Sequence, residues 1–546
     1  MDTIIEFCVL IGGTVGLAAF FGTYLARLIT FEMRPLQKTL AKVESGFYKV
    51  IGVDVTKQMN WKEYFLALFV TNMVVVAFII WILTFQNYLP LSEPNKGGFS
   101  FDLAFHTAIS FTTEPDLQHY AGDQQLTITS QMVAITFPMF IAPASGISAA
   151  FAFIRSFIRK NYGLGNFYVD FTRIIITLLL PIAFVSSIIL MILGVPQTLQ
   201  STIRTNTLEG IVNHNFTNTQ KITIGPVASL ESIKLLGGNG GGFFGSGSGH
   251  PFENPTGVSN IYEMFLMLLI PLSFPIAYAK LMGKGRGLSI LLAMLMGFGI
   301  LILFSTSQIS GPSLLETRFG NFGSVLFNTV SLATNTGAAN SALLGMSPNA
   351  IISFFLGMFI QAIPGAVGAG MTTMIVYVLL TLFIVGLMVG KTPEFMGMKI
   401  VPKDIKLAVF IFLLHPALIL IPTVISLGTG NAQAIMNTIK VTPMVYTQAL
   451  YEYTSSAANS GSDYFGASAN TPFWNYSAAI VMFLGRYLPF GLMLAIAGSF
   501  TAKDRKEVIE SIQTQGPVFT IILITITFLL TVLTFFPFLI LGPFSL

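Results

Sequence analysis

The chain has 546 residues, of which 53% are hydrophobic and only 10% are charged. Soluble domains typically carry about 25% charged residues, so this composition indicates an integral membrane protein. Cys8 is the single cysteine, which excludes a disulfide framework and a cysteine-based metal site. The net charge of +4 comes from basic residues clustered between apolar segments, a pattern typical of membrane orientation rather than nucleic-acid binding.

Apolar windows of about 20 residues, long enough to cross the hydrocarbon as a helix, recur along the chain. They predict an all-α membrane protein with about ten transmembrane helices, in windows 3–28, 63–86, 127–154, 171–195, 258–282, 287–308, 348–389, 405–428, 474–500 and 516–541. The seventh window is too long for one straight crossing. It contains PGAVGAG at residues 364–370, where we expect the helix to break because Pro lacks an N–H and Gly is flexible. Such a break is either a simple kink or the wall of a water-filled path.

Most of the 28 basic residues fall on one side of these windows. That side holds Arg27, Arg34, Lys38, Lys42, Lys49, Lys57, Lys62, Arg155, Arg159, Lys160, Arg173, Lys280, Lys284, Arg286, Lys391, Lys399, Lys403, Lys406, Lys503, Arg505 and Lys506. The other side holds only Lys96, Arg204, Lys221, Lys234, Arg318 and Lys440. The positive-inside rule therefore predicts a cytoplasmic first set and places both termini outside the cell.

Four short stretches rich in Gly, Asn, Thr and Ser lie between apolar windows, all on the predicted outer side. They are FTTEPDLQHY from Phe111, LLGGNGGGFFG from Leu235, LATNTGAANS from Leu332 and YTSSAANSGSDYFG from Tyr453. Each follows a short segment of helical character and precedes a long apolar one. Their carbonyls and hydroxyls can replace the water around a dehydrated cation, and four copies suffice to ring one ion.

After the first span, the chain therefore reads as span, re-entrant pore loop and span, four times over, with a closing tenth helix. We expect a single membrane domain, 1–546, with the four repeats in a pseudo-fourfold arrangement. Its predicted parts are an extra N-terminal helix (1–30), repeat 1 (63–157), repeat 2 (171–283), repeat 3 (287–390), repeat 4 (405–500) and a C-terminal helix (516–541).

Three of the polar stretches align without gaps at one triplet. The aligned triplets are Gly238, Asn239 and Gly240; Asn335, Thr336 and Gly337; and Asn459, Ser460 and Gly461. A position that needs Gly usually needs a positive φ or a close backbone approach, which turns carbonyls inward. Thr and Ser add hydroxyl oxygens, Asn can brace the loop, and the short helices at 225–236 and 322–333 would aim their negative ends at the pore.

The first stretch departs from this pattern with Glu114, Pro115 and Asp116, which lack the glycine. The two carboxylates either attract or coordinate cations at the outer mouth, or are solvated residues of an external loop. Arg486 is the one basic residue in the middle of a predicted helix, so it should face a polar interior. It either lies beneath the loops and repels cations from a straight exit, or pairs with a buried carboxylate or with loop carbonyls.

Four features argue against an enzyme. GLMVGKT, from Gly386, has too few residues between its glycines for a nucleotide-binding loop and ends an apolar helix. No DKTGT-type phosphorylation sequence is present, and no polar stretch is long enough for a nucleotide domain, so the chain alone is not expected to hydrolyse ATP. The histidines show no paired metal spacing: His106, His119, His214, His250 and His415.

Several long motifs carry a resemblance to a known family. GPVASLESIKLLGGNGGGFFG with HPFENPT from His250, LMVGKTPEFMG, and YEYTSSAANSGSDYFGASANTPFWN from Tyr451 closely resemble the potassium-binding A subunit of the Kdp potassium-transporting ATPase. The resemblance runs from about residue 35 to the C-terminus. That subunit belongs to the superfamily of potassium transporters, whose members are built from four span–hairpin–span units.

The resemblance implies a non-catalytic, channel-like subunit in a bacterial or archaeal plasma membrane, with K+ as the transported ion and no organic cofactor. Such a subunit selects external potassium and passes it through a tunnel to the B subunit, a P-type ATPase, in a complex completed by C and F subunits. By motif, the filter residues would be Glu114, Pro115, Asp116, Gly238, Asn239, Gly240, Asn335, Thr336, Gly337, Asn459, Ser460 and Gly461. The gate or tunnel residues would be Gly365, Gly368, Gly370 and Arg486.

Two departures from the family pattern affect the external face. Family members usually have Asn or Asp with Thr and Asn in the first hairpin, and a polar segment with His and Asp where this chain has SALLGMSPNA. Affinity or selectivity could therefore differ.

Two alternative functions remain: a self-sufficient potassium channel or symporter of the Trk or Ktr type, and a carrier for an organic solute. The HPFENPT and NTPFWN motifs favour the pump subunit over the channel or symporter.

Overall fold

The computed structural model describes residues 2–31, 42–46, 48–49, 52–93, 96–158, 163–206, 211–212, 215–216, 219–245, 247–308, 315–503 and 512–545. Seven residues discussed above lie outside these ranges: Arg34, Lys38, Arg159, Lys160, His214, Arg505 and Lys506.

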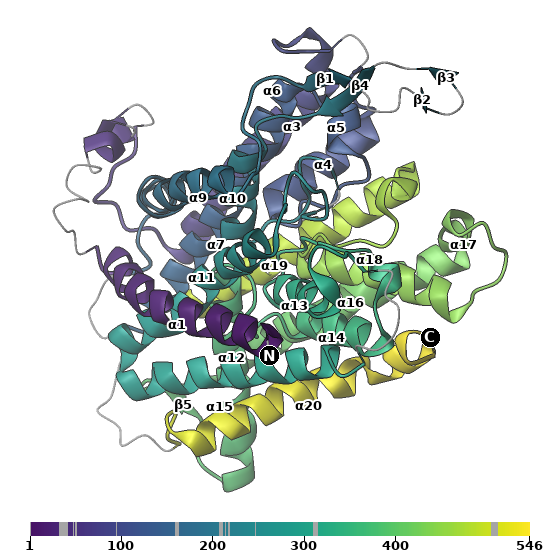
Figure 1. The fold of residues 1–546 in the computed structure, drawn as a ribbon. Helices are drawn as coiled ribbons and strands as arrows, with labels where there is room; N and C mark the ends of the chain where they lie inside the picture. The colour runs from purple at the N-terminus through teal and green to yellow at the C-terminus, as the bar shows by residue number, and fades with distance from the viewer. Residues whose placement is uncertain are drawn as a thin grey trace.

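The described chain is almost entirely helical (Figure 1). Its α-helices are α1 (Asp2–Ile29), α3 (Trp61–Thr84), α4 (Phe101–Thr113), α5 (Gly122–Gln125), α6 (Ile128–Ser130), α7 (Pro138–Arg155), α8 (Phe167–Arg173), α9 (Leu180–Ile192), α10 (Val227–Gly237), α11 (Gly257–Met282), α12 (Lys284–Ser305), α13 (Gly320–Ala333), α14 (Pro348–Ile360), α15 (Ala369–Val389), α16 (Pro402–Gly428), α17 (Asn431–Ile435), α18 (Pro443–Ala458), α19 (Pro472–Thr501) and α20 (Pro517–Leu541). Two π-helical turns are η2 (Gln131–Thr136) and η3 (Ile174–Leu179), and the 3-10 turns are η1 (Gln86–Tyr88), η4 (Leu343–Gly345), η5 (Gly466–Ala469) and η6 (Pro543–Ser545).

Ten helices of the described chain are long and apolar enough to cross a membrane, and each overlaps one predicted window. They are α1, α3, α6–η2–α7, α8–η3–α9, α11, α12, α15, α16, α19 and α20. The predicted break in the seventh window is confirmed, because α14 ends at Ile360 and α15 begins only at Ala369.

A short helix precedes each polar stretch: α4, α10, α13 and α18. The chain order therefore gives four span–hairpin–span units, with α1 before them and α20 after them, which confirms the predicted fold class. The residue limits assigned to each repeat stay a prediction.

Helix starts and distortions follow from local chemistry. The Asn60 side chain accepts from the backbone N–H groups of Lys62 and Glu63, and Glu63 reaches back to the Asn60 N–H, so α3 begins with a capping box. Each of the π-turns η2 and η3 ends two positions before a proline, Pro138 and Pro181 respectively. Since Pro has no N–H, the preceding turn rearranges its hydrogen bonds there.

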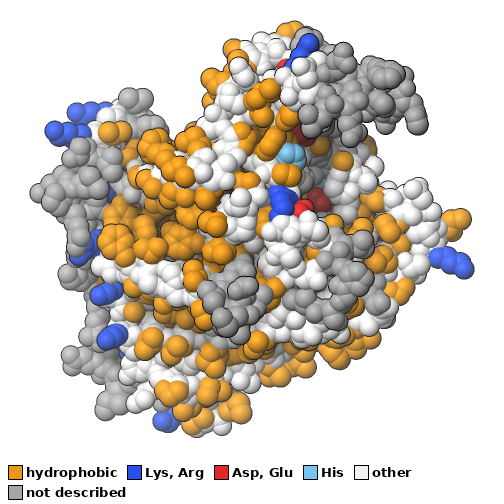
Figure 2. All heavy atoms as spheres, in the orientation of Figure 1, with side chains coloured by type: hydrophobic (Ala, Val, Ile, Leu, Met, Phe, Trp, Pro, Cys, Tyr) orange, Lys and Arg blue, Asp and Glu red, His pale blue; other side chains and the backbone are white. Residues whose placement is uncertain are grey.

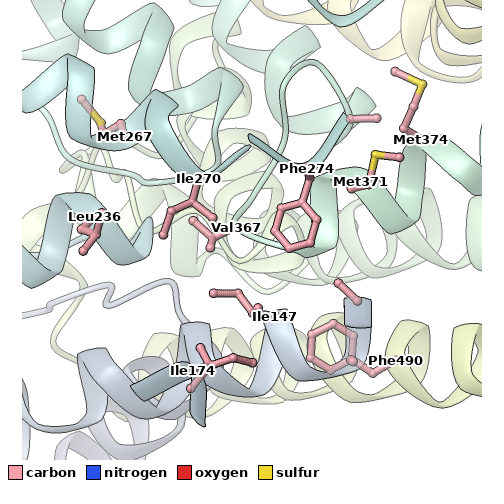
Figure 3. Packing of buried hydrophobic residues seen from close by; sticks show 14 of the residues in the cluster. Ile147, Ile174, Leu236, Met267, Ile270, Phe274, Val367, Met371, Met374 and Phe490 are labelled. Carbon is pink, nitrogen blue, oxygen red and sulfur yellow. The ribbon is translucent and has the colours of Figure 1, made fainter. Parts of the chain in front are cut away.

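The apolar core lies where the hairpins meet the long helices. Figure 3 shows Val367, from the break between α14 and α15, among Ile147 of α7 and Ile270 and Phe274 of α11. Leu236, in the last turn of α10, packs in the same cluster. The core thus connects the break in the seventh span to the end of the short helix α10.

The first and last helices lie outside the four units. α1 packs along α11, and α20 packs against α12, α14 and α15 (Figure 1). The molecular surface in Figure 2 carries many apolar side chains, as expected for a surface in contact with lipid tails.

A small β-element was not predicted from the sequence. β1 (Thr202–Asn206) pairs antiparallel with β4 (Thr219–Thr223), with Thr202 opposite Thr223. This ribbon extends away from the helices at the top of Figure 1, together with β2 (Ile211–Val212) and β3 (Asn215–Phe216). The third pair in the described chain is β5 (Glu394–Phe395) with β6 (Met398–Lys399), after the end of α15.

Candidate functional site

Each of the four short helices ends at one of the predicted triplets, and the first residue of every triplet has a left-handed backbone. The φ angles are +86° at Glu114, +69° at Gly238, +51° at Asn335 and +53° at Asn459. A positive φ is uncommon for a residue other than glycine, and its recurrence at one aligned position shows that the four turns share a conformation.

Three of the turns close with the same backbone hydrogen bond, from the N–H of the middle residue to the carbonyl five residues earlier. These bonds join Asn239 to Lys234 (2.8 Å), Thr336 to Ser331 (2.8 Å) and Ser460 to Ser455 (2.9 Å). Such a bond closes a helix that ends in a left-handed residue. Pro115 has no N–H to make it, so in the first turn the N–H of Asp116 donates to the Ser110 carbonyl at 3.4 Å.

The asparagines of the triplets brace the turns, as the sequence predicted. The side-chain amide of Asn239 donates to the Met139 carbonyl at 3.1 Å, on α7 of the first repeat. The corresponding bonds of the other two triplets run to neighbouring backbone, from Asn335 to Ala458 (3.1 Å) and from Asn459 to Met482 (3.1 Å). Each of these three loops is therefore held by its asparagine side chain.

The structure brings all four triplets together at Gly240. A Cβ atom built on Gly240 would lie 3.1 Å from the carbonyl oxygens of both Thr336 and Ser460 and would overlap that of Pro115. The middle carbonyls of the other three triplets thus meet beside this glycine. Only glycine fits, because any side chain would displace the oxygens.

Further contacts join neighbouring hairpins around this point. The Gly240 N–H donates to the Pro115 carbonyl at 3.1 Å, and the Gly242 N–H donates to Gln118 Oε1 at 2.8 Å. On the other side of the second loop, the Ser248 N–H donates to the Ala339 carbonyl at 2.9 Å. The arrangement is a closed set of contacts between separate re-entrant turns.

The two carboxylates of the first triplet are fully buried, so the interpretation of Glu114 and Asp116 as solvated loop residues is wrong. Glu114 forms an ion pair with Nη1 of Arg486. Nη2 of Arg486 donates to the Ala142 carbonyl at 2.9 Å, and the guanidinium lies 4.5 Å from the ring centre of Phe490. Of the two interpretations of Arg486, pairing with a buried carboxylate is the one observed, and the pair lies at the inner side of the triplets.

Among the described residues, Asp116 has no counter-ion of its own, unlike Glu114. Neither of its carboxylate oxygens has a hydrogen-bond partner among the described residues. A buried, unpaired carboxylate is costly, so this side chain is suited to a mobile cation that the protein does not itself supply.

An open hollow of about 500 Å³ lies on the outer side of the triplets. This outer hollow is lined by residues that include Gln118, Gly241, His250, Gly337, Gly461 and Asp463. Figure 2 shows a recess in which a few charged and histidine side chains gather amid apolar ones. Burial and the neighbouring Glu452 raise the pKa of Asp463 to about 7, which keeps part of this wall neutral near neutral pH.

A narrower cavity of about 70 Å³ lies on the inner side. This inner cavity is lined by residues that include Asn335, Asn459, Arg486, Gln361, His415 and Phe535. It therefore leads from the underside of the third and fourth triplets, past Arg486, sideways towards α16 and α20.

The predicted gate glycines shape the break rather than line this cavity. The Gly365 N–H donates to the Ala333 carbonyl at 2.9 Å, which attaches the break to the end of α13. A Cβ on Gly370 would lie 2.5 Å from the Pro364 carbonyl, and one on Gly368 would lie 2.9 Å from the Gly146 carbonyl. Arg486 is the predicted gate residue that does line the cavity.

Two buried clusters behind the triplets were not predicted. In the first, Lys234 Nζ lies 2.6 Å from Glu231 and near the buried Glu253 and Glu263. In the second, the rings of His106 and His119 stack with centroids 3.9 Å apart. The motif HPFENPT contained a signal for the first cluster, since Glu253 is the one acidic residue of this Pro-containing segment.

The fold and these loops define a multi-pass membrane protein in which four re-entrant hairpins surround one polar point. In fold, the chain is similar to the potassium transporter TrkH from Vibrio parahaemolyticus, with a TM-score of 0.54 and 14% identity over 90% of this chain and 99% of that chain.

Residues 8–545 match the family of KdpA, the potassium-transporting ATPase A subunit. The chain belongs to this family. It is therefore a potassium transporter subunit, and the family resemblance expected from the sequence motifs is confirmed.

Proposed function

We propose that the chain is the ion-selecting subunit of an ATP-driven potassium uptake system and that the four triplets are its filter. The observation that carries this proposal is the meeting of the Pro115, Thr336 and Ser460 carbonyls beside Gly240. Carbonyls brought together in this way replace the hydration shell of a potassium ion. The C-terminal ends of the four short helices add negative potential at the same point.

In this proposal, potassium enters from the outer hollow and leaves through the inner cavity. The exit is lateral, since Arg486 and Glu114 occupy the space directly beneath the triplets and the cavity continues towards α16 and α20. A lateral exit suits delivery to a neighbouring ATPase. The B subunit would be that P-type ATPase, with C and F subunits completing the complex and both termini of this chain outside the cell.

The second candidate is a self-sufficient channel or symporter of the Trk type, which the fold similarity to TrkH favours. Purification of the full chain with its native partners separates the two. The pump subunit predicts that a P-type ATPase copurifies and that potassium stimulates its ATP hydrolysis. Potassium flux through the purified chain alone, without ATP and at the rate seen in cells, would reverse this assignment.

Replacement of Gly240 tests the filter itself. Gly240→Ala would push a methyl group into the Pro115, Thr336 and Ser460 carbonyls, so the apparent affinity for potassium should fall by at least about tenfold, or 1.4 kcal/mol. Rubidium uptake by potassium-depleted cells measures this affinity. Gly299→Ala is the matched control, because its Cβ would have no neighbour within 4 Å. An unchanged affinity in Gly240→Ala would remove the basis of the filter assignment.

A further inference from the structure

His119 and Glu452 form a buried pair behind the first and fourth triplets. The hydrogen bonds around this pair leave two acceptors facing each other, with no proton between them. His119 follows the first triplet on its hairpin, Glu452 lies on α18, and Asn475 lies on α19. All three side chains are fully buried, and none belongs to a triplet. Nε2 of His119 lies 3.5 Å from Oε1 of Glu452.

The orientation of Asn475 fixes the tautomer of His119. Nδ2 of Asn475 donates to Oδ2 of Asp102 at 2.8 Å and to Oδ1 of Asn470 at 3.0 Å. The Asp102 carboxylate can only accept, so the Asn475 amide cannot be reversed, and its oxygen faces Nδ1 of His119 at 2.7 Å. Nδ1 of His119 therefore carries a hydrogen.

Asp102 supports this assignment because it is an anion. Burial opposes ionisation, but hydrogen bonds from Ser100 and Asn475 outweigh it and leave the pKa of Asp102 below its usual value. Its carboxylate can only accept, which holds the Asn475 amide in the orientation described.

With a hydrogen on Nδ1, a neutral His119 would present the lone pair of Nε2 to the Glu452 carboxylate. Two acceptors facing each other in a buried place repel, and no other hydrogen-bond partner of Nε2 or of the two Glu452 oxygens exists among the described residues. A proton between Nε2 and Oε1 turns this repulsion into a charge-assisted hydrogen bond.

We infer that His119 and Glu452 form a binding site for one exchangeable proton, which fastens the first hairpin to α18 of the fourth repeat. The proton resides on Nε2, giving an imidazolium–carboxylate pair, or on Oε1, giving a neutral pair. Both descriptions contain the same number of protons.

Other titratable groups surround this site from each neighbouring element. His106 of α4 stacks on His119, and Tyr453 of α18 and Asp463 of the fourth loop lie close to Glu452. Neither ring nitrogen of His106 has a hydrogen-bond partner among the described residues, so a second positive charge on the stacked ring is disfavoured. Asp463 also lines the outer hollow.

Loss of this proton leaves the Nε2 lone pair against the carboxylate and pushes the first hairpin away from α18. Because Pro115 lies on that hairpin, the ring of carbonyls loosens. We therefore expect the apparent potassium affinity to fall about tenfold as external pH rises.

The test is Glu452→Gln in the full chain with its native partners, with rubidium uptake measured between about pH 5 and pH 9. The glutamine amide donates a permanent N–H to Nε2, so this variant should keep the acid-side affinity of the wild type at every pH. Glu316→Gln is the control, since Glu316 lines the same hollow but pairs with Arg318 at 3.1 Å. It should keep the wild-type pH dependence.

A pH-independent wild-type affinity, or a Glu452→Gln variant with the wild-type pH dependence, would overturn the inference while leaving potassium uptake intact. Failure to take up potassium or rubidium at any pH would instead overturn the proposed function. Infrared difference spectra of the full chain in membranes give a second readout that does not require transport. The wild type should lose a carboxyl or imidazolium signal as pH rises, and identical spectra from Glu452→Gln would contradict the site.

Discussion

At the scale of single residues, the ion pair between Glu114 and Arg486 sets the charge beneath the four triplets. Both side chains are buried, and the pair joins the first hairpin to α19. A charged residue at membrane depth is tolerated when it has a partner inside the protein. The pair therefore neutralises Arg486 beside the path proposed for a cation.

Replacing Glu114 alone should lower the potassium affinity more than replacing both Glu114 and Arg486. Glu114→Gln leaves the Arg486 guanidinium uncompensated below the triplets, where it repels a cation, so we expect the apparent potassium affinity to fall by at least about tenfold. The double variant Glu114→Gln with Arg486→Gln should recover part of this loss. Rubidium uptake measures both variants. Wild-type affinity in Glu114→Gln would show that this pair does not influence the ion.

Sequence reasoning identified both residues but left their relation open. Glu114 and Arg486 are far apart in the chain, and only the packing of α19 beneath the first hairpin brings them together. The His106–His119 stack was missed for a similar reason. The two rings lie on opposite sides of the turn at Pro115, and the shape of that turn cannot be read from residue spacing.

At the scale of elements, the four helix–turn units share a left-handed first residue but do not close in the same way. Pro115 lacks the N–H group that the middle residue of each of the other three turns donates to a carbonyl of the preceding helix. What the triplets have in common is the carbonyl of the middle residue, which proline retains. The first hairpin therefore keeps the oxygen and loses only the closing bond.

This distinction predicts opposite outcomes for two substitutions at contacting positions. Pro115→Ala restores the missing N–H and keeps the carbonyl, so potassium affinity should stay within about twofold of the wild type. Gly461→Ala places a Cβ on the Pro115 carbonyl at a φ of +97°, so affinity should be lost. Titration of rubidium uptake compares them. The account would be wrong if Pro115→Ala were the more damaging change.

Most elements could be predicted because membrane spans and helix breaks depend on local sequence. Apolar length located the ten spans, and the Pro and Gly residues at 364–370 located the break before α15. The β1–β4 ribbon was missed because its strands are polar and exposed and lack alternating apolar residues. The contacts among the four triplets follow from how the spans pack, which no local pattern specifies.

At the scale of the whole molecule, the four hairpins separate two spaces of different character. The outer hollow is wide and open, whereas the inner cavity is narrow and turns sideways towards α16 and α20. Such a geometry admits a hydrated ion on one side and confines a dehydrated one on the other. It suits a subunit that selects an ion and hands it to a neighbour.

The most direct test of this account is an experimental density map of the full chain in a membrane environment, collected with rubidium or thallium in place of potassium. We predict one or more cation peaks on the axis between Pro115, Gly240, Thr336 and Ser460, within coordination distance of backbone oxygens from all four hairpins. A map in which the cations lie elsewhere, or in which these four turns do not face a common ion, would contradict it.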